Sequence, residues 1–151
     1  MGLLSGAPRV ESLTITSEPD QLVRMRSWLW TALVGENVPL DDCADLLLAA
    51  GELCNNSIKH AYRGGAGQPI HLLFRASEDE IAIEVEDFGV PFDSSRYVPP
   101  DFDALPDHGL GLHLVNRIAD RVAFDVARER GTRWTLIRHR SGGAPRTDTT
   151  Q

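Results

Sequence analysis

Alternating apolar and polar residues predict five short β-strands along the chain. In a half-buried strand every second side chain faces the core, so apolar residues recur with a period of two. The segments with this pattern are 10–16, 70–75, 81–86, 122–127 and 132–139. A polar segment at 77–80 separates the second strand from the third, and 128–131 separates the last two. Each of these two pairs is therefore expected to form a hairpin.

Apolar residues at helical spacing predict three α-helices. The first is expected to follow Ser17, which could act as its N-cap, and to end near Gly35. The second is expected to run from about 41 to 61, and the third from 110 to 119. Between 88 and 108 the chain contains several prolines and few periodic apolar residues, which indicates a long irregular loop. Loops of this length inside compact domains are typical of functional lids or disordered segments.

The order of these elements is β-α-α-β-β-lid-α-β-β. Such an order favours an α+β fold, a two-layer sandwich in which helices cover one face of a mostly antiparallel sheet. We expect one domain over residues 9–140, with its lid at about 88–108. The ends, 1–8 and 141–151, are expected to be disordered because the tail is polar and rich in glycine and proline.

Length and charge exclude several classes of function. The 151 residues suffice for one domain with a substantial core. A formal net charge of −7 disfavours non-specific binding to nucleic acids. The sequence contains no apolar run of about 18 residues and no signal-peptide pattern, so no membrane association is expected. The two cysteines, Cys43 and Cys54, are isolated, which argues against disulfides and zinc and favours a cytoplasmic location.

Four polar residues fall on one stripe of the second predicted helix: Glu52, Asn56, Lys59 and His60. At 3.6 residues per turn they occupy an arc of roughly 100°. A carboxylate, an amide and two potential cations could together position a metal-bound polyphosphate and a proton acceptor. The alternative is an ordinary solvated helix face.

Asp87 and Gly89 follow the third predicted strand. A carboxylate at this point could accept a hydrogen bond from an amino group, and a glycine would let a flat ring approach the backbone. Asp and Gly are also the residues expected in a simple strand-ending turn. Gly131 and Thr132, in the last hairpin, give a weaker signal of the same kind.

Glycines also open the third predicted helix, in the sequence His108-Gly109-Leu110-Gly111-Leu112. Exposed backbone N–H groups at a helix N-terminus favour phosphate binding. A flexible hinge at the start of a helix is the alternative interpretation of the same glycines.

Taken in order, these motifs resemble those of the GHKL, or Bergerat-fold, ATPases. The resemblance spans residues 47–137. Within that superfamily, segments 52–62 and 87–93 are most similar to the bacterial anti-sigma factor serine kinases of the RsbW type. The resemblance implies an ATP-binding sandwich of the Bergerat type with a lid over the nucleotide.

The resemblance also implies a role for individual residues. Glu52 would be the catalytic base that takes the proton from a partner's serine, and Asn56 would hold Mg²⁺ on the ATP phosphates. Asp87 would bind the adenine amino group, supported by Gly89 and Thr132. The remaining nucleotide contacts implied are Lys59, His60, His108, Gly109, Leu110, Gly111 and Leu112. Lys59 and His60 could instead only cap the end of their helix.

Partners follow from the resemblance as well. Such kinases hold an RNA polymerase sigma factor inactive and phosphorylate a STAS-domain anti-sigma factor antagonist, and they are generally homodimers. Arg24 matches an arginine that serves the partner interface in these proteins. One departure concerns Asp107 and His108, where some relatives place an arginine, while Arg96 is the lid's own cation. ATP binding is therefore expected more firmly than phosphoryl transfer.

Three alternatives follow from the same residues. The chain could bind nucleotide and a partner without transferring phosphate, or could be a detached histidine-kinase catalytic domain. A metal hydrolase built on the five histidines is the third alternative, but their spacing repeats no ligand pattern.

Overall fold

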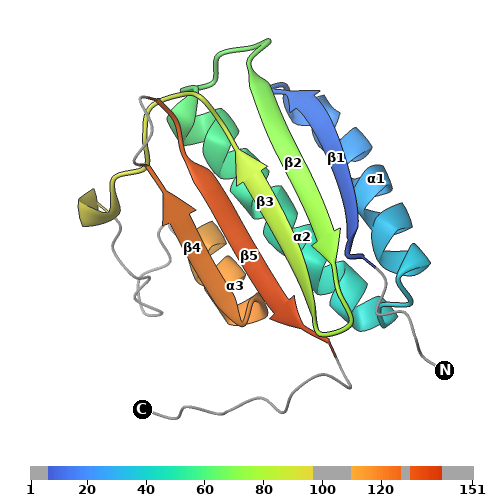
Figure 1. Ribbon diagram of the computed structural model, residues 1–151. Helices are drawn as coiled ribbons and strands as arrows, with labels where there is room; N and C mark the ends of the chain where they lie inside the picture. The colour runs from blue at the N-terminus through green and yellow to red at the C-terminus, as the bar shows by residue number, and fades with distance from the viewer. Residues whose placement is uncertain (1–6, 97–109, 127–129, 141–151) are drawn as a thin grey trace, which may run out of the picture.

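A computed structural model of the chain describes residues 7–96, 110–126 and 130–140. Five strands and three α-helices form two layers (Figure 1). The strands are β1 (Arg9–Thr16), β2 (Pro69–Ala76), β3 (Glu80–Glu86), β4 (Arg121–Asp125) and β5 (Arg133–His139). The helices are α1 (Leu22–Gly35), α2 (Leu40–Asn56) and α3 (Leu110–Ile118), with short turns η1 (Pro19–Gln21), η2 (Ser57–Ala61) and η3 (Ser94–Arg96).

The strands form one antiparallel sheet in the order β1-β2-β3-β5-β4. Both predicted hairpins are present, β2 with β3 and β4 with β5. The last hairpin reverses its order in the sheet, so that β5 pairs with β3 and β4 becomes an edge. This arrangement places the end of β3 beside the start of β5, with Glu86 opposite Arg133.

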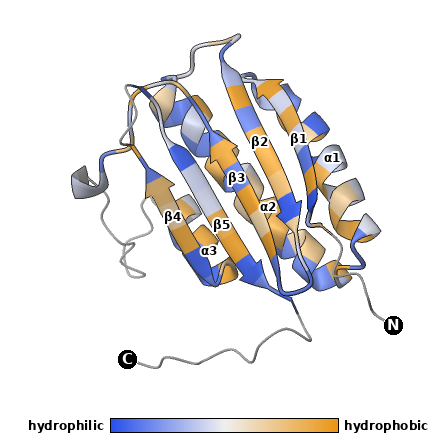
Figure 2. Cartoon of the chain, in the orientation of Figure 1, coloured by the Kyte–Doolittle hydropathy of each residue, from blue (hydrophilic) through white to orange (hydrophobic). Residues whose placement is uncertain are grey.

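The three helices cover one face of the sheet (Figure 1). Alternate strand residues that face the helices are apolar, as the orange bands along the strands show (Figure 2). The core between the two layers contains fully buried side chains from strands and helices alike, including Phe74, Ile83, Leu136, Leu29 and Leu53. The predicted α+β two-layer sandwich is therefore confirmed.

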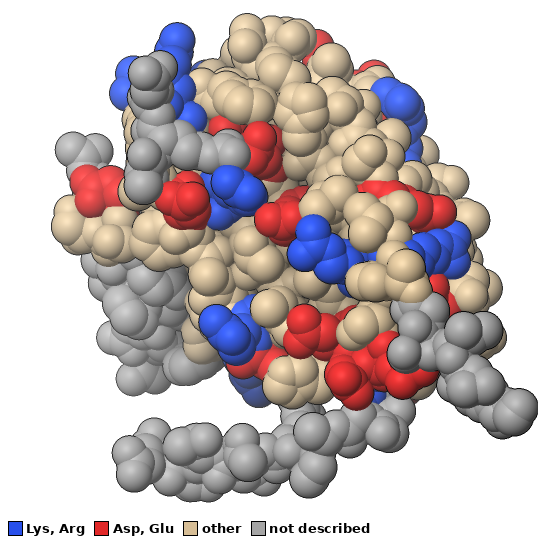
Figure 3. Space-filling model, in the orientation of Figure 1, with Lys and Arg blue, Asp and Glu red and all other residues tan. Residues whose placement is uncertain are grey.

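The opposite face of the sheet is polar. Figure 3, which looks onto this face, shows acidic and basic side chains interspersed across it. Arg133 pairs here with Glu84, Glu86 and Asp125 on the two neighbouring strands. Cross-strand ion pairs of this kind let a sheet present one face to water.

The start of the first helix differs from the prediction. Ser17 does not cap the helix: its hydroxyl donates to the Gly65 carbonyl at 2.5 Å and accepts from the Gln68 amide at 3.1 Å. The helix instead begins through the η1 turn at Pro19, whose fixed φ suits a first helical turn. Ser17 is buried because it ties the loop before β2 to the end of β1, a contact that local sequence does not reveal.

The second predicted helix contains a change of geometry at its end. The α-helix stops at Asn56, and residues 57–61 form a single π-turn, with the Tyr62 amide bonded to the Ser57 carbonyl at 2.9 Å. Single π-turns often occur at functional sites because they redirect side chains. The expected disorder at the two ends and the segment 97–108 of the expected lid lie outside the described residues, apart from residues 7 and 8.

Candidate functional site

Asp87 is the best-defined polar group of the site. Its carboxylate is buried beyond the end of β3, on the helix-facing side. It accepts hydrogen bonds from the Ser57 hydroxyl at 2.7 Å, the Gly89 amide at 3.2 Å and the Thr132 amide at 3.3 Å. Two carboxylate oxygens offer about four acceptor positions, so one remains for a ligand's N–H group. The predicted role of Asp87 therefore has suitable geometry.

Burial changes the acidity of Asp87. Desolvation raises the pKa of this carboxyl above its ordinary value, while the bonds from Ser57, Gly89 and Thr132 lower it and so oppose the shift. These three hydrogen-bond donors hold the carboxylate of Asp87 in one orientation. A fixed acceptor of this kind can select a ligand by its hydrogen-bonding pattern.

Two glycines bring backbone segments into close contact around Asp87. A Cβ at Gly89 would lie 2.3 Å from the Ala61 carbonyl oxygen, and one at Gly131 would lie 1.9 Å from the Asp87 carbonyl oxygen. Gly131 also has a φ of 87°, which side chains disfavour. The role of Gly131 is stronger than its sequence signal suggested, because its contact partner is 44 positions away.

Thr132 connects Asp87 to the beginning of the predicted lid. Its amide donates to Asp87, and its buried hydroxyl accepts a hydrogen bond from the Phe92 amide at 2.9 Å. The Phe92 ring packs edge-to-face against Trp134 and Phe124, with ring centres 4.8 and 5.0 Å apart. This part of the chain is thus anchored to β4 and β5.

Glu52 and Asn56 lie one helical turn apart on α2, both partly exposed, as their spacing predicted. Lys59 and His60 are exposed and lie in the π-turn that follows α2, and their contact with a nucleotide stays a prediction. Within the described part of the chain, none of the four side chains has a hydrogen bond or ion pair.

The first turn of α3 lies against Glu52. A Cβ at Gly111 would come 2.5 Å from Oε2 of Glu52, so only a glycine leaves this carboxylate its present position. Leu112, on the same turn, packs partly buried against the core. Leu110 begins α3, whereas His108, Gly109 and Asp107 lie outside the described residues, and their roles stay predictions.

Oxygen donors suitable for Mg²⁺ are present at Glu52 and Asn56. Carboxylate and amide oxygens are typical protein ligands of this ion, which normally keeps several waters and substrate phosphate oxygens. Both side chains lack a protein partner within the described residues, which fits a site completed by a bound metal phosphate. The described residues contain no group of three or more side chains that could hold a metal ion.

Arg24 lies apart from this group of residues. It is exposed on α1, donates to the Gln21 side chain at 2.9 Å, and borders a groove between α1 and the edge strand β1. Leu13 and Trp28 line the same groove. Its role in a partner interface stays a prediction.

Sequence reasoning missed two polar residues that support the site. One is Ser57, whose hydroxyl donates to the Asp87 carboxylate at 2.7 Å. The Tyr62 hydroxyl donates to the Pro69 carbonyl at 2.6 Å and accepts from the Phe88 amide at 2.8 Å. A serine at a fully buried helical position is the signal that could have identified Ser57, since buried hydroxyls need partners.

This combination of fold and site defines a class of nucleotide-binding proteins. The chain belongs to the histidine kinase-like ATPase domain family, whose match spans residues 15–138. The resemblance to GHKL ATPases is thereby confirmed. None of the described helices has the length and apolar character needed to cross a membrane.

Particular relatives are serine-protein kinases named RsbW. The protein from Bacillus cereus (strain AH187) is 38% identical over 90 residues, covering 54% of this chain and 56% of that protein. The protein from Bacillus mycoides (strain KBAB4) is 37% identical over 90 residues, which again cover 54% of this chain and 56% of that protein. The chain thus spans about half the length of these relatives.

A solved structure has a similar fold. The crystal structure of the RsbU and RsbW domains of Rv1364c from Mycobacterium tuberculosis matches with a TM-score of 0.65 at 17% identity. The match covers 92% of this chain and 35% of that chain. At this identity the likeness bears on the fold alone, and it agrees with the predicted architecture.

Proposed function

We propose that this chain binds Mg-ATP and transfers its terminal phosphoryl group to a serine of a partner protein. The single observation that carries the proposal is the contact between Gly111 and the carboxylate of Glu52. It puts a potential base next to the first turn of α3, where N-terminal amides favour phosphate. The family match and the relatives named as serine-protein kinases support the same conclusion.

Nucleotide binding would use the two ends of the site differently. Asp87 would accept a hydrogen bond from the adenine amino group, in an orientation held by Ser57, Gly89 and Thr132. Asn56 and the segment 108–112 would hold the phosphates. A bound Mg²⁺ would neutralise phosphate charge and orient the reacting group.

In the transfer step, Glu52 would accept the proton of the partner's serine hydroxyl. The hydroxyl oxygen then forms a bond to the terminal phosphorus as the bond from that phosphorus to the bridging oxygen of ADP breaks. Phosphoryl transfer depends mainly on positioning and charge stabilisation, so a fixed base and a held phosphate are the main requirements. The contact with Gly111 would keep Glu52 in line with the phosphate.

The regulatory role we propose is that of a partner-switching anti-sigma factor. In this role the chain, as a homodimer, would hold an RNA polymerase sigma factor and phosphorylate a STAS-domain antagonist. Arg24, at the exposed groove on α1, would contribute to the partner interface. The similarity to RsbW supports this assignment.

A second candidate is a nucleotide-binding regulatory module that sequesters a partner without phosphoryl transfer. Asp107 and His108 favour it, because they stand where some relatives have an arginine. A missing cation near the terminal phosphate would weaken transition-state stabilisation but leave ground-state binding intact.

The test is transfer of labelled phosphate from Mg-ATP to a purified STAS-domain antagonist. We expect label on one antagonist serine, lost by at least about 10²-fold in Glu52→Gln, as for removal of a general base. Asn56→Ala should lose both ATP binding and transfer, whereas its neighbour Asn55→Ala should retain both. ATP binding without transfer by the unaltered chain would favour the second candidate, and absence of ATP binding would overturn both.

A further inference from the structure

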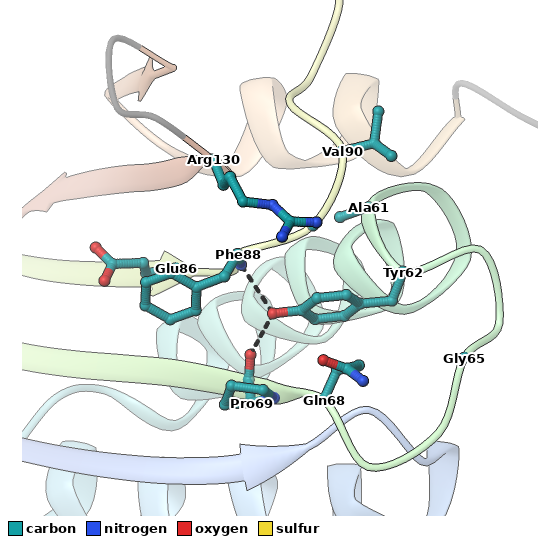
Figure 4. A pocket seen from close by; sticks show the side chains of 10 residues that line it. Ala61, Tyr62, Gly65, Gln68, Pro69, Glu86, Phe88, Val90 and Arg130 are labelled. Carbon is teal, nitrogen blue, oxygen red and sulfur yellow. Dashed lines mark hydrogen bonds between the residues drawn. The ribbon is translucent and has the colours of Figure 1, made fainter.

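A pocket of about 860 Å³ borders the Asp87 site and shares Gly89 with it. It is bordered by Tyr62, by Gln68 and by the segment 86–90, with Arg130 from the last hairpin on its wall (Figure 4). Its volume lies within the range of ordinary ligand pockets. Gly89 and Tyr62 belong both to this pocket and to the surroundings of Asp87, but no role proposed above places a ligand in the pocket.

The pocket and Asp87 lie on opposite sides of one extended segment. Successive side chains of extended backbone point in opposite directions. Asp87 turns toward the helices, where it meets Ser57, whereas Glu86 and Phe88 line the pocket. Phe88 packs edge-to-face on His71 of β2, with ring centres 5.4 Å apart, which fixes its ring on this side.

The apolar part of the pocket is open to solvent. Phe88 is 39% exposed and Val90 is 46% exposed, although both are large hydrophobic residues. Figure 4 shows the Tyr62 ring extending across the pocket, with its hydroxyl already satisfied by Pro69 and Phe88. An occupant would therefore meet ring faces and aliphatic carbon here. Exposed apolar surface beside polar groups is typical of interaction sites.

The polar part of the pocket favours an acidic occupant. Arg130 is exposed and has no ion pair among the described residues, and its guanidinium could bind a carboxylate bidentately. Glu86, the acidic residue of the pocket, is paired with Arg133 on β5, with 3.4 Å between Nε of Arg133 and Oε2 of Glu86. The Gln68 side chain also lacks a hydrogen-bond partner in the part of the chain that the structure describes. The Arg130 guanidinium and the Gln68 amide together suit a single carboxylate. The charge of Glu86 is partly compensated by Arg133, and it would repel a singly charged carboxylate less than a dianionic phosphate.

We propose that this pocket docks an acidic, hydrophobic segment of a protein partner. An apolar side chain of the segment would pack on Phe88 and Val90, and an adjacent carboxylate would pair with Arg130. A protein segment fits better than a small molecule because the exposed rings lie on an open rim, which a continuous chain can cover. The inference concerns a surface distinct from the phosphate end of the candidate site, and it holds with or without phosphoryl transfer.

The probe for the test is the acetylated, amidated tetrapeptide Asp-Phe-Leu-Glu, titrated into the full chain labelled with ¹⁵N. We expect saturable amide shifts at Tyr62, Gly65 and Phe88, which weaken as salt is added. Arg130→Ala should weaken binding about three- to fivefold, the effect of losing one exposed ion pair. Arg75→Ala removes another exposed arginine, one on β2, and should leave the affinity unchanged.

Three results would overturn the proposal. One is the absence of saturable shifts at these residues, and another is equal binding of the tetrapeptide Lys-Phe-Leu-Lys. The third is an affinity that does not change in Arg130→Ala while the variant keeps its native amide spectrum. Equally tight binding of phenylacetate would replace the protein segment with a small carboxylate as the occupant, and would also contradict the proposal.

Discussion

Gly111 of α3 and Glu52 of α2 are in direct contact, so that a Cβ on Gly111 would lie 2.5 Å from the Glu52 carboxylate oxygen. The two residues are 59 positions apart in sequence and come from different helices. The contact aligns the first turn of α3 with the polar stripe of α2. A substitution at either residue should therefore change the position of the other.

Gly111→Ala should impair phosphoryl transfer without destabilising the fold. The atom it meets is the free end of a flexible side chain, so Glu52 can move away, and alanine is favoured over glycine in helices by up to about 1 kcal/mol. Displacement of the base should lower the transfer rate about 10²-fold. Gly51→Ala is the control, because a Cβ there meets only Met25 at 3.9 Å. Equal rates in both variants, measured with labelled ATP, would contradict a positioned base.

Gly131→Ala should be strongly destabilising. A Cβ would overlap the Asp87 carbonyl, and the φ of 87° adds backbone strain. We expect a loss of about 3 kcal/mol or more in the free energy of unfolding, measured by urea denaturation. Gly67→Ala has a similar φ of 75° in open space, so it should cost only about 1 kcal/mol. Similar losses in both variants would show that the contact with Asp87 is unimportant.

Thr132→Val should weaken the anchor of the segment that begins the predicted lid. The change keeps the shape of the side chain but leaves the Phe92 amide without its acceptor. A part-buried amide left unpaired should lower the free energy of unfolding by about 1 kcal/mol. Thr132→Ser retains the hydroxyl and should restore amide protection of Phe92 in hydrogen exchange. Equal protection in the valine and serine variants would mean that this bond does not hold the segment.

Asp87→Asn should change the pH dependence of stability. Burial raises the pKa of Asp87 above its ordinary value of 3.8, so the folded state holds this proton more tightly than the unfolded state. The carboxyl therefore destabilises the fold progressively as the pH rises from about 3.8 through the folded pKa, and the effect is constant above it. The amide does not titrate.

The free energy of unfolding of Asp87→Asn relative to the unaltered chain should therefore increase with pH across that window. Urea denaturation of both proteins from acidic to neutral pH provides the measurement. The asparagine can accept from Gly89 and Thr132 and donate to Ser57, so the geometry is conserved. A difference that decreases with rising pH would show that Asp87 is stabilised as the charged form.

Much of the fold could be predicted because strands and helices have local signatures. The alternation along 81–86 and the helical spacing along 110–119 each reflect one residue's position relative to its near neighbours. The corresponding elements, β3 and α3, begin and end within a residue or so of the predicted bounds. The polar residues that mark the candidate site also stand out locally, as Glu52 and Asn56 do on a helix rich in leucine, alanine and cysteine.

The amino-acid sequence by itself thus determined the elements, their class and the residues with suitable chemistry, since each depends on short-range periodicity and residue type. Only the tertiary structure decided which of them meet. The pairing of Ser57 with Asp87, the approach of Gly131 to the Asp87 backbone and the hydrogen bond from Phe92 to Thr132 join residues 30 to 44 positions apart. Such contacts arise when the sheet closes in the order β1-β2-β3-β5-β4 and the helices pack on it. Local sequence patterns do not reveal these contacts, because packing and hydrogen bonding between elements depend on distance in space.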